Sequence, residues 1–359
     1  MCDALIVRSD ECLLHVPGAE IWLGVRTPGT EIPERAMRIE QALRDHGHRV
    51  IDAGSHDDDI LLRVHDPELV RHLRTVWDRW VEAGLTADDR HDRVVPYLIP
   101  SAGMLDGLPE REPTAVHAAA GRWCYDTMTL VGPGTWTAAR AAVDVTLTAV
   151  GAVLTGDHLA YALTRPPGHH VTRSAFGGSC YLNNAAIAAQ ALRESGHERI
   201  AVIDIDAHHG NGTQAIFYER DDIFYGSLHV DPGAGWFPHY AGFADEVGRD
   251  AGTGANLNVP LAPGSGDTLW LAALDRIIEG AAHHGATALV VSLGVDAAAA
   301  DPESPLLITH EGYEESGRRL AGLGLPTVAV QEGGYHLDTV GELVALTLRG
   351  LSSCAPSSR

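Results

Sequence analysis

Short runs rich in Val, Ile and Leu alternate along the chain with longer segments whose apolar positions recur every three to four residues. The short runs have the length and composition of buried strands, and the longer segments have the period of amphipathic helices. Apolar strands that are separated by helices indicate a mostly parallel sheet with helices on both faces. The pattern therefore predicts an α/β fold.

The expected strands lie in seven apolar runs: DALIVR, HRVIDAG, LAYALTR, RIAVIDID, IFYGSLHV, TALVVSLGVD and PTVAVQEGGY. Several of the expected helices end at glycine, which favours a left-handed helix cap, and they span 33–47, 67–84, 135–156, 183–196, 267–285 and 309–324. Residues 85–134 are rich in Pro, Gly, Asp and Arg and have no clear period, which predicts a long inserted loop. We expect a single domain over 1–351 and a flexible tail over 352–359.

Most of the chemically unusual residues follow an expected strand directly. They lie in the segments RPPGHH, DIDAHHGNG, SLHVDPG, LGVDAAAADP and QEGGY. The carboxyl ends of the strands meet at one edge of an open α/β sheet, and ligands bind there. The five loops therefore predict one site at that edge.

Two carboxylates and an imidazole end the run AVIDIDAHH. The period of two in a strand predicts that Asp204, Asp206 and His208 share a face. Two carboxylates this close are costly to bury without a cation, and an Asp/His set suits zinc or ferrous iron better than calcium. Asp296, which ends LVVSLGVD, is the natural donor of a further ligand. These residues predict a catalytic metal site.

His169 and His170 are candidates for proton transfer. Adjacent residues of a turn are expected to point in divergent directions, so the pair more easily flanks a metal-bound water than completes the coordination. Asp204 and Asn211 are suitable partners to orient the two rings. Exposed turn histidines are the alternative.

Aromatic side chains in the same loops extend the predicted site. Tyr335, after two glycines, is placed to stabilise an oxyanion, although a tyrosine near a strand end is commonly a packing residue. Trp236 and Phe237 are either walls for an alkyl chain or loop anchors. Other polar residues of these loops are either supporting partners or ordinary loop polarity: His209, His229 and Asp301.

The composition narrows the kind of protein. The chain has 359 residues, 45% of them hydrophobic, and a formal net charge of -22. This acidity argues against nucleic-acid binding and is compatible with a cationic small substrate. Five scattered cysteines without a CxxC pair indicate reduced thiols and a cytoplasmic location. The run ATALVVSLGV is too short to span a bilayer, so we expect no membrane association.

Several motifs resemble the histone deacetylase and acetylpolyamine amidohydrolase family, within the arginase-like α/β fold. They include RPPGHH, GGSCYLNNAAIAAQAL, DIDAHHGNGTQAIFYERDD, SLGVDAAAADP and QEGGYH, and the resemblance covers about residues 20–350. HHGNGTQ and SLGVD look closer to bacterial acetylpolyamine amidohydrolases and the class II branch.

The resemblance implies a role for each candidate residue. It implies Zn²⁺, with Fe²⁺ or Co²⁺ as substitutes, on Asp206, His208 and Asp296, a proton-transferring pair at His169 and His170, and a carbonyl-polarising Tyr335. It also implies a structural K⁺ or Na⁺ near the backbone of Asp204, Asp206, His208, Ser227 and Leu228.

The chain also departs from the family. An aromatic residue usually precedes CYLNN and forms one wall of the substrate tunnel, whereas this chain has Ser179, which leaves Phe237 and Trp236 as the opposite wall. In acetylpolyamine amidohydrolases a loop like the insertion helps form a dimer and narrows the entrance, so the resemblance implies a homodimer through 85–134. The insertion contains Glu110 and Glu112, but neither matches a gate carboxylate of polyamine-cleaving relatives.

The implied function is a zinc-dependent amidohydrolase that removes an acetyl or small acyl group from an acetylpolyamine or a similar small acetylated amine. One alternative is a protein acetyl-lysine deacetylase, and another is a deacylase of a specialised metabolite. An arginase-like ureohydrolase needs more Asp ligands than GVDAAAADP offers. A metal-binding sensor without catalysis is the alternative that is not an enzyme.

Overall fold

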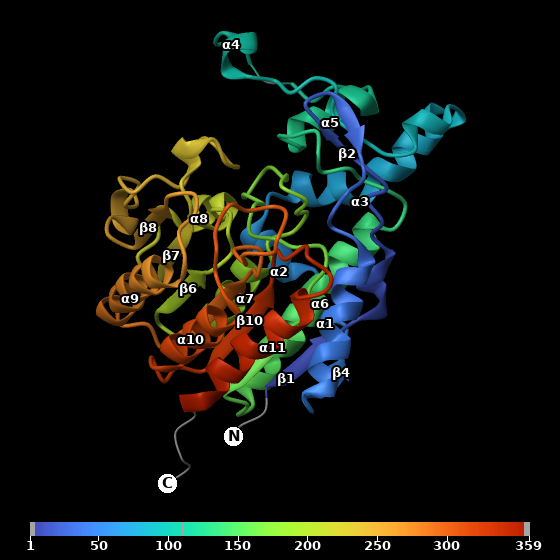
Figure 1. The fold of residues 1–359 in the computed structure, drawn as a ribbon. Coiled ribbons are helices and arrows are strands. Elements are labelled where there is room, and N and C mark those ends of the chain that lie inside the picture. Colours follow the sequence, from blue (N-terminus) through green and yellow to red (C-terminus); the bar gives the residue numbers. More distant parts are fainter. Residues whose placement is uncertain (1–3, 110, 355–359) are drawn as a thin grey trace.

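Eight parallel strands form the central sheet of the computed structural model, which describes residues 4–109 and 111–354 (Figure 1). Their order in space is β4 (Arg49–Asp52), β1 (Leu5–Arg8), β5 (Leu159–Ala162), β10 (Thr327–Gln331), β9 (Ala288–Leu293), β6 (Ile200–Asp204), β7 (Ile223–Val230) and β8 (Asn256–Leu261). The seven expected strands are all present. Only β8 has no counterpart, because two asparagines and a proline interrupt its apolar pattern. Proline is tolerated there because β8 is an edge strand.

Helices cover both faces of the sheet, which confirms the predicted α/β architecture. One layer contains α2 (Asp59–Val64), α3 (Pro67–Glu82), α6 (Thr135–Leu154) and α7 (Asn184–Glu194). The other contains α1 (Pro33–Asp45), α9 (Asp267–His284), α10 (His310–Ala321) and α11 (Val340–Leu351). Alternate strand residues enter opposite layers, as the period of two requires: Leu5 and Val7 join the first, Ile6 the second.

The six expected helices are present, and four further helices of six or more residues accompany them. Three are short: α2, α5 (Val116–Trp123) and α8 (Asn211–Phe217). The fourth, α11, is buried at nearly every position, so its sequence lacks the polar face that marks an amphipathic helix.

The insertion at 85–134 is more ordered than its sequence predicts. It contains α4 (Ala102–Leu105) and the buried helix α5, which packs against α3. The Ala- and Gly-rich sequence of α5 hides its period. The two-stranded hairpin of β2 (Glu20–Trp22) and β3 (Val25–Thr27) lies beside it (Figure 1). Ile21 N–H donates to the carbonyl of Thr127 (3.2 Å), and Thr127 Oγ1 donates to the carbonyl of Ile21 (2.7 Å).

The C-terminal tail and one apolar helix also bear on the sequence predictions. The tail predicted at 352–359 begins with a short 3-10 helix over Ser352–Cys354, and 355–359 lie outside the described residues. By length and composition, α6 is the one helix in the described chain that is apolar enough to cross a membrane, and it is longer than ATALVVSLGV. Its contacts with β1, β5, β10 and α7 make it a core helix of the sheet.

Candidate metal centre and active site

The five polar loops follow five adjacent strands, in the spatial order β5, β10, β9, β6 and β7. Their side chains therefore meet at one edge of the sheet. A cavity of about 460 Å³ opens there, and His170, His208 and Tyr335 line its inner end. The structure thus brings together residues that lie up to 165 positions apart in the sequence, as the loop pattern predicts.

Asp206, His208 and Asp296 form a compact group of potential metal ligands, with one donor atom from each within 4.8 Å of the others. His208 Nδ1 lies 3.3 Å from Asp206 Oδ1 and 3.1 Å from Asp296 Oδ2. The prediction that strand alternation aligns Asp204, Asp206 and His208 is wrong, because β6 ends at Asp204. Backbone hydrogen bonds position the two ligand carboxylates instead: Gly333 N–H donates to Asp206 Oδ2 (2.7 Å) and Ala207 N–H to Asp296 Oδ1 (2.7 Å).

The electrostatics of this group favour a dication. Burial and the Asp206 carboxylate raise the pKa of Asp296 to about 7. Burial also opposes ionisation of Asp206, but His169 and His208 hold its pKa below the ordinary value. The two carboxylates therefore resist carrying full charge together, and a bound divalent metal removes that penalty.

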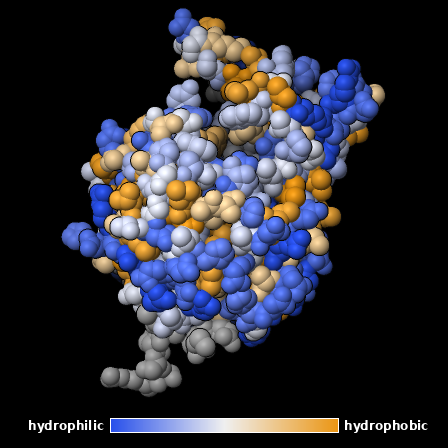
Figure 2. Space-filling view, viewed as in Figure 1, coloured by the Kyte–Doolittle hydropathy of each residue, from blue (hydrophilic) through white to orange (hydrophobic). Residues whose placement is uncertain are grey.

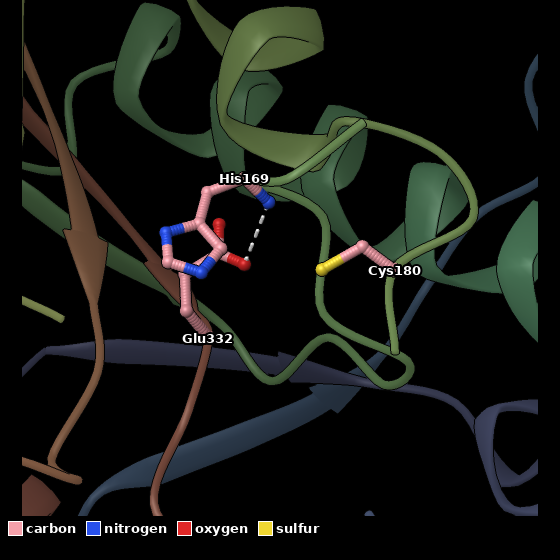
Figure 3. A group of neighbouring side chains, drawn as sticks. All are labelled: His169, Cys180 and Glu332. Atoms are coloured by element: carbon pink, nitrogen blue, oxygen red, sulfur yellow. Dashed lines mark hydrogen bonds between the residues drawn. The ribbon is translucent and has the colours of Figure 1, made fainter. Parts of the chain in front are cut away.

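A second group of potential ligands combines His169 with Cys180 and Glu332 (Figure 3). Glu332 Oε2 already accepts the N–H groups of Gly168 (2.7 Å) and His169 (3.1 Å). Burial raises the pKa of Glu332 to about 7. This carboxylate holds the backbone of the RPPGHH loop in place, so the Asp206 group is the better metal candidate. Glu332 lies in the QEGGY motif, but the motif alone does not indicate that its carboxylate binds the backbone of another loop.

The histidine pair is buried, which excludes exposed turn histidines. His169 is 2% exposed and His170 4%. Their rings do not diverge as predicted, because the ring centroids are only 4.0 Å apart. The expected partners are in place: His169 Nδ1 lies 3.1 Å from Asp204 Oδ2, and His170 Nδ1 lies 2.8 Å from Asn211 Oδ1. The two rings therefore pack side by side beside the metal group.

Tyr335 is held more firmly than two preceding glycines suggest. Asp301 Oδ2 accepts the N–H groups of Tyr335 (2.6 Å) and His336 (3.1 Å), which gives Asp301 the role of a supporting partner. The guanidinium carbon of Arg35 lies 4.5 Å from the centroid of the Tyr335 ring. The phenol therefore faces the cavity from a fixed backbone.

A buried ion cluster links the loops of Tyr335 and the histidines. Glu31 Oε1 lies 2.7 Å from Arg35 Nη1 and 2.9 Å from Arg165 Nε. Arg35 donates to the carbonyls of Glu332 (2.7 Å) and Gly334. Arg165 precedes PPGHH, so one carboxylate supports both loops. Sequence reasoning missed Glu31 and Arg35, because they precede or begin an ordinary helix and not a strand end.

The residues expected to form the tunnel walls lie in the cavity lining. Gly178, Ser179, Trp236 and Phe237 all line the cavity. A Cβ at Gly178 would lie 2.3 Å from the His170 ring, so only glycine fits there. The Ser179 backbone is left-handed (φ +60°) and its N–H donates to Thr129 Oγ1 (2.9 Å).

Other polar residues singled out by the sequence lie away from the cavity lining. Ser227 lies opposite Asp204 in the register of β7 and β6, and its Oγ is 2.8 Å from His229 Nδ1. Leu228 is fully buried. The rings of His209 and His229 pack at a tilt of 56°, with centroids 4.6 Å apart.

Of the two glutamates in the insertion, Glu112 does not line the cavity. Glu112 is exposed and pairs with Arg122 (3.6 Å). Glu110 lies outside the described residues.

The match to a known family extends over almost the whole chain, since the histone deacetylase domain matches residues 30–351. The chain belongs to the histone deacetylase family. It is 38% identical over 348 residues to the acetylpolyamine amidohydrolase of Mycoplana ramosa, covering 97% of this chain and 99% of that protein. Identity to acetylpolyamine amidohydrolase 1 of Pseudomonas aeruginosa is 40% over 352 residues, covering 98% and 99%. A crystal structure of acetylpolyamine aminohydrolase from Burkholderia pseudomallei gives a TM-score of 0.92 at 37% identity, covering 98% of this chain and 100% of that chain.

These matches confirm the predicted family, fold and enzyme class, a hydrolase that acts on acetyl amide bonds. Histone deacetylase 8 of Arabidopsis thaliana matches only 62% of the chain, at 39% identity. The broader match to acetylpolyamine amidohydrolases agrees with the expected branch. The family is generally metal-dependent, which agrees with the group of Asp206, His208 and Asp296.

Proposed function

We propose that this chain removes the acetyl group from a small N-acetylated amine, such as an acetylpolyamine, in a zinc-dependent reaction. The observation that carries the proposal is the convergence of the metal group, the histidine pair and Tyr335 at the inner end of one cavity. The relatives named acetylpolyamine amidohydrolase support the substrate class.

Asp206, His208 and Asp296 fit a zinc ion, with Fe²⁺ or Co²⁺ as substitutes, because zinc accepts carboxylate oxygens and imidazole nitrogens, and three protein ligands leave a coordination position open for catalysis. These three residues would hold the ion. When bound, zinc supplies Lewis acidity toward the amide carbonyl and the attacking water.

His170 moves the proton in this proposal. Its Nδ1 faces Asn211, so Nε2 is left to accept a proton from the attacking water and to return one to the leaving amine. Burial, with His169 and His208 nearby, lowers the pKa of His170 well below its ordinary value. The ring is therefore neutral, and ready to accept a proton, at neutral pH. His169, anchored on Asp204, supports the ring beside it.

Tyr335 stabilises the charge that develops on the carbonyl oxygen. Burial raises the pKa of its phenol well above the ordinary value, so the group stays protonated and donates a hydrogen bond. The amide C–N bond then breaks, and acetate and the free amine are the products.

Three further expectations belong to the proposal. A K⁺ or Na⁺ ion near Asp204 and Ser227 is supported by their opposed positions on paired strands. A homodimer through the insertion is supported by its exposed apolar side chains: Tyr97, Leu98, Ile99, Met104 and Leu108. Figure 2 shows orange surface at the top of the molecule, where Figure 1 places α4 of the insertion. Sedimentation velocity measures whether the protein is a dimer in solution. Cytoplasmic location is supported by the scattered cysteines, three of which are buried free thiols.

Acetate release tests the function. The substrates are acetylputrescine, acetylspermidine, an acetyl-lysine peptide and neutral N-acetyl amines, with Zn²⁺ or Co²⁺ supplied. We expect release from the small cationic amides, and a loss of about 100- to 1,000-fold in kcat for Tyr335→Phe, because one oxyanion donor is removed. Unchanged turnover in this variant contradicts the role of Tyr335, and faster release from the peptide favours the protein deacetylase.

A further inference from the structure

The loop between β7 and β8 carries one wall of the cavity and also contacts a catalytic residue. Trp236 and Phe237 of this loop line the cavity. The Phe237 ring packs edge-on against the His170 ring, with centroids 4.8 Å apart and an interplanar angle of 87°. Edge-to-face packing is a preferred geometry of aromatic rings. The position of the loop therefore affects the position of the His170 ring.

Gln214 connects this loop to the helix on which the partner of His170 lies. It is a buried residue of α8, and α8 begins at Asn211, whose Oδ1 lies 2.8 Å from His170 Nδ1. The Gln214 Oε1 atom accepts hydrogen bonds from three buried side chains: His209 Nε2 (3.0 Å), Asn256 Nδ2 (3.0 Å) and Asn258 Nδ2 (2.8 Å). Its Nε2 atom is therefore directed to a further partner, in the loop.

Glu246 is that partner, and it holds the loop in place. Its Oε2 atom accepts hydrogen bonds from Gln214 Nε2 (2.6 Å), the Gly242 N–H (2.9 Å) and Asn258 Nδ2 (3.2 Å). Asn256 Nδ2 donates to the Glu246 carbonyl (2.6 Å). One half-buried carboxylate thus ties the loop to α8 and to β8.

Gly242 gives the loop a closely fitted anchor near Phe237. Its φ is +103°, and a Cβ at this position would lie 2.7 Å from the His209 ring and 2.9 Å from His229 Nε2. His229 Nε2 donates to the Gly242 carbonyl (2.8 Å). Both backbone polar groups of Gly242 are therefore bonded, one to His229 and one to Glu246, so the loop has little freedom there.

We propose that Gln214 and Glu246 are positioning residues for His170. Through α8 the pair fixes Asn211 beside the imidazole, and through the loop it fixes Phe237. The inference rests on the proposed function, in which His170 moves the proton, and neither Gln214 nor Glu246 lines the cavity. Proton transfer requires the imidazole within hydrogen-bond reach, and a displacement of about 1 Å can cost about 100-fold in rate.

The kinetic test uses the zinc-loaded protein with N-acetyl-1,4-diaminobutane and with the shorter N-ethylacetamide. We expect Glu246→Ala to lower kcat about tenfold on both amides and to change KM by less than about twofold, because the displaced group is His170. Glu246→Gln keeps an oxygen for its three amide donors and should retain at least about half of kcat. The matched control is Asp245→Ala, since Asp245 is exposed, and it should change neither constant. A loss confined to KM for the longer amide would mean that Glu246 only shapes the wall, which overturns the inference.

The His170 ring also reports its position without turnover. In protein labelled with ¹³C at histidine Cε1, its signal is the one lost in His170→Ala. We expect Glu246→Ala to shift this signal, because the ring current of Phe237 depends on distance, and Asp245→Ala to leave it unmoved. Gln214→Met has a similar length without the donor or acceptor, so it breaks the same contact from the other side and should shift the signal too. It decides the question if circular dichroism shows that Glu246→Ala is unfolded.

The outcomes separate the inference from the proposed function. Acetate release by the original chain, with an unmoved His170 signal in Glu246→Ala and Gln214→Met, overturns the inference and leaves the function standing. A shifted signal with unchanged kcat overturns it as well. Absence of acetate release from every amide overturns the proposed function, and the position of the His170 signal then decides alone whether the pair holds the ring.

Discussion

The inner and outer ends of the cavity are built in different ways. At the inner end, buried partners hold the polar groups at short distances, such as 3.1 Å from His169 to Asp204 and 2.8 Å from His170 to Asn211. At the outer end, Trp22 is 52% exposed, and Glu20 has one hydrogen bond, from a backbone N–H. The inner end is attached to the strands of the sheet, and the outer end to a hairpin and an insertion.

This difference separates chemistry from selectivity. A displacement at the inner end breaks several buried contacts together, so it is costly. A change at the outer end alters few contacts, so the fold tolerates it. Substitutions at the two ends should therefore separate into effects on kcat and effects on substrate preference.

The largest expected effect is that of metal removal, at the inner end. A chelator should reduce acetate release to background and should lower the thermal midpoint, because Asp206 and Asp296 are then buried without a neutralising cation. A ligand at about 1,000 times its Kd contributes about 4 kcal/mol of stability. Calorimetry and an acetate assay, before and after addition of Zn²⁺ or Co²⁺, measure both effects. Full activity in metal-free protein, verified by elemental analysis, contradicts the metal site.

Glu31→Gln tests the scaffold behind the inner end. Removing the charge between Arg35 and Arg165 should lower kcat about tenfold and leave KM nearly unchanged, because Glu31 touches no substrate. We expect a loss of about 3 kcal/mol of unfolding free energy, since two buried guanidinium groups lose their partner. Steady-state kinetics and urea denaturation measure these changes. Glu219→Gln, which breaks a surface ion pair with Arg249, is the control. We expect it to lower the unfolding free energy by less than about 1 kcal/mol. A change confined to KM would argue against a positioning role.

Ser179→Tyr tests the outer end. An aromatic ring should restore the second wall, raise kcat/KM for linear acetylated amines a fewfold and lower it for branched ones, with kcat for the best substrate little changed. The left-handed backbone at 179 costs a bulky side chain on the order of 1 kcal/mol of stability. Ser179→Ala keeps the volume free and should keep the preference of the unsubstituted protein. If both variants show the same preference, Ser179 does not shape the cavity.

The smallest expected effect concerns the core beneath the outer wall. His72 packs against Trp123 and Phe176, and neither of its ring nitrogens has a hydrogen-bond partner. Burial lowers the pKa of His72 to about 3, so the unfolded chain binds a proton that the folded chain does not. Because of this histidine, the free energy of unfolding decreases as the pH falls from about 6.5 toward 3, by up to about 1.4 kcal/mol per pH unit.

His72→Leu should remove this loss. Urea denaturation gives the unfolding free energy of the variant and of the original chain at each pH. We expect the difference between them to favour the variant by about 1 kcal/mol more at pH 5.5 than at pH 7.5. The exposed His117, replaced by Leu, serves as the control. If the unfolding free energies of the original chain and of His72→Leu change with pH in parallel, groups other than His72 control the sensitivity to acid.

The sequence predicts the inner end better than the outer end, for a physical reason. Asp206, Asp296 and Tyr335 follow apolar strands, and a parallel sheet brings the ends of its strands together whatever their separation in the chain. Glu20 and Glu31 come from a hairpin and the approach to a helix, whose place relative to the sheet depends on packing. Arg35 bonds to Gly334, 299 positions away, and no periodicity signals such a contact.

The same reasoning explains the differences in the fold. Helices with one polar face, such as α3, are visible in the sequence. The helix α5 was missed because Ala and Gly occupy its positions, and α11 because both of its faces are buried. A fully buried strand is still visible as a short apolar run, whereas the period of a helix is visible only where its burial is one-sided.

The two hydrogen bonds between Ile21 and Thr127 couple two parts of the molecule that the sequence separates. Glu20 precedes Ile21, and Thr127 belongs to the insertion, so any displacement of the insertion is transmitted to the carboxylate at the mouth of the cavity. A second copy bound to the insertion would thus adjust the mouth of the cavity and leave the sheet-edge chemistry untouched. Substrate preference would then vary with protein concentration, and assembly would act as a thermodynamic variable of specificity.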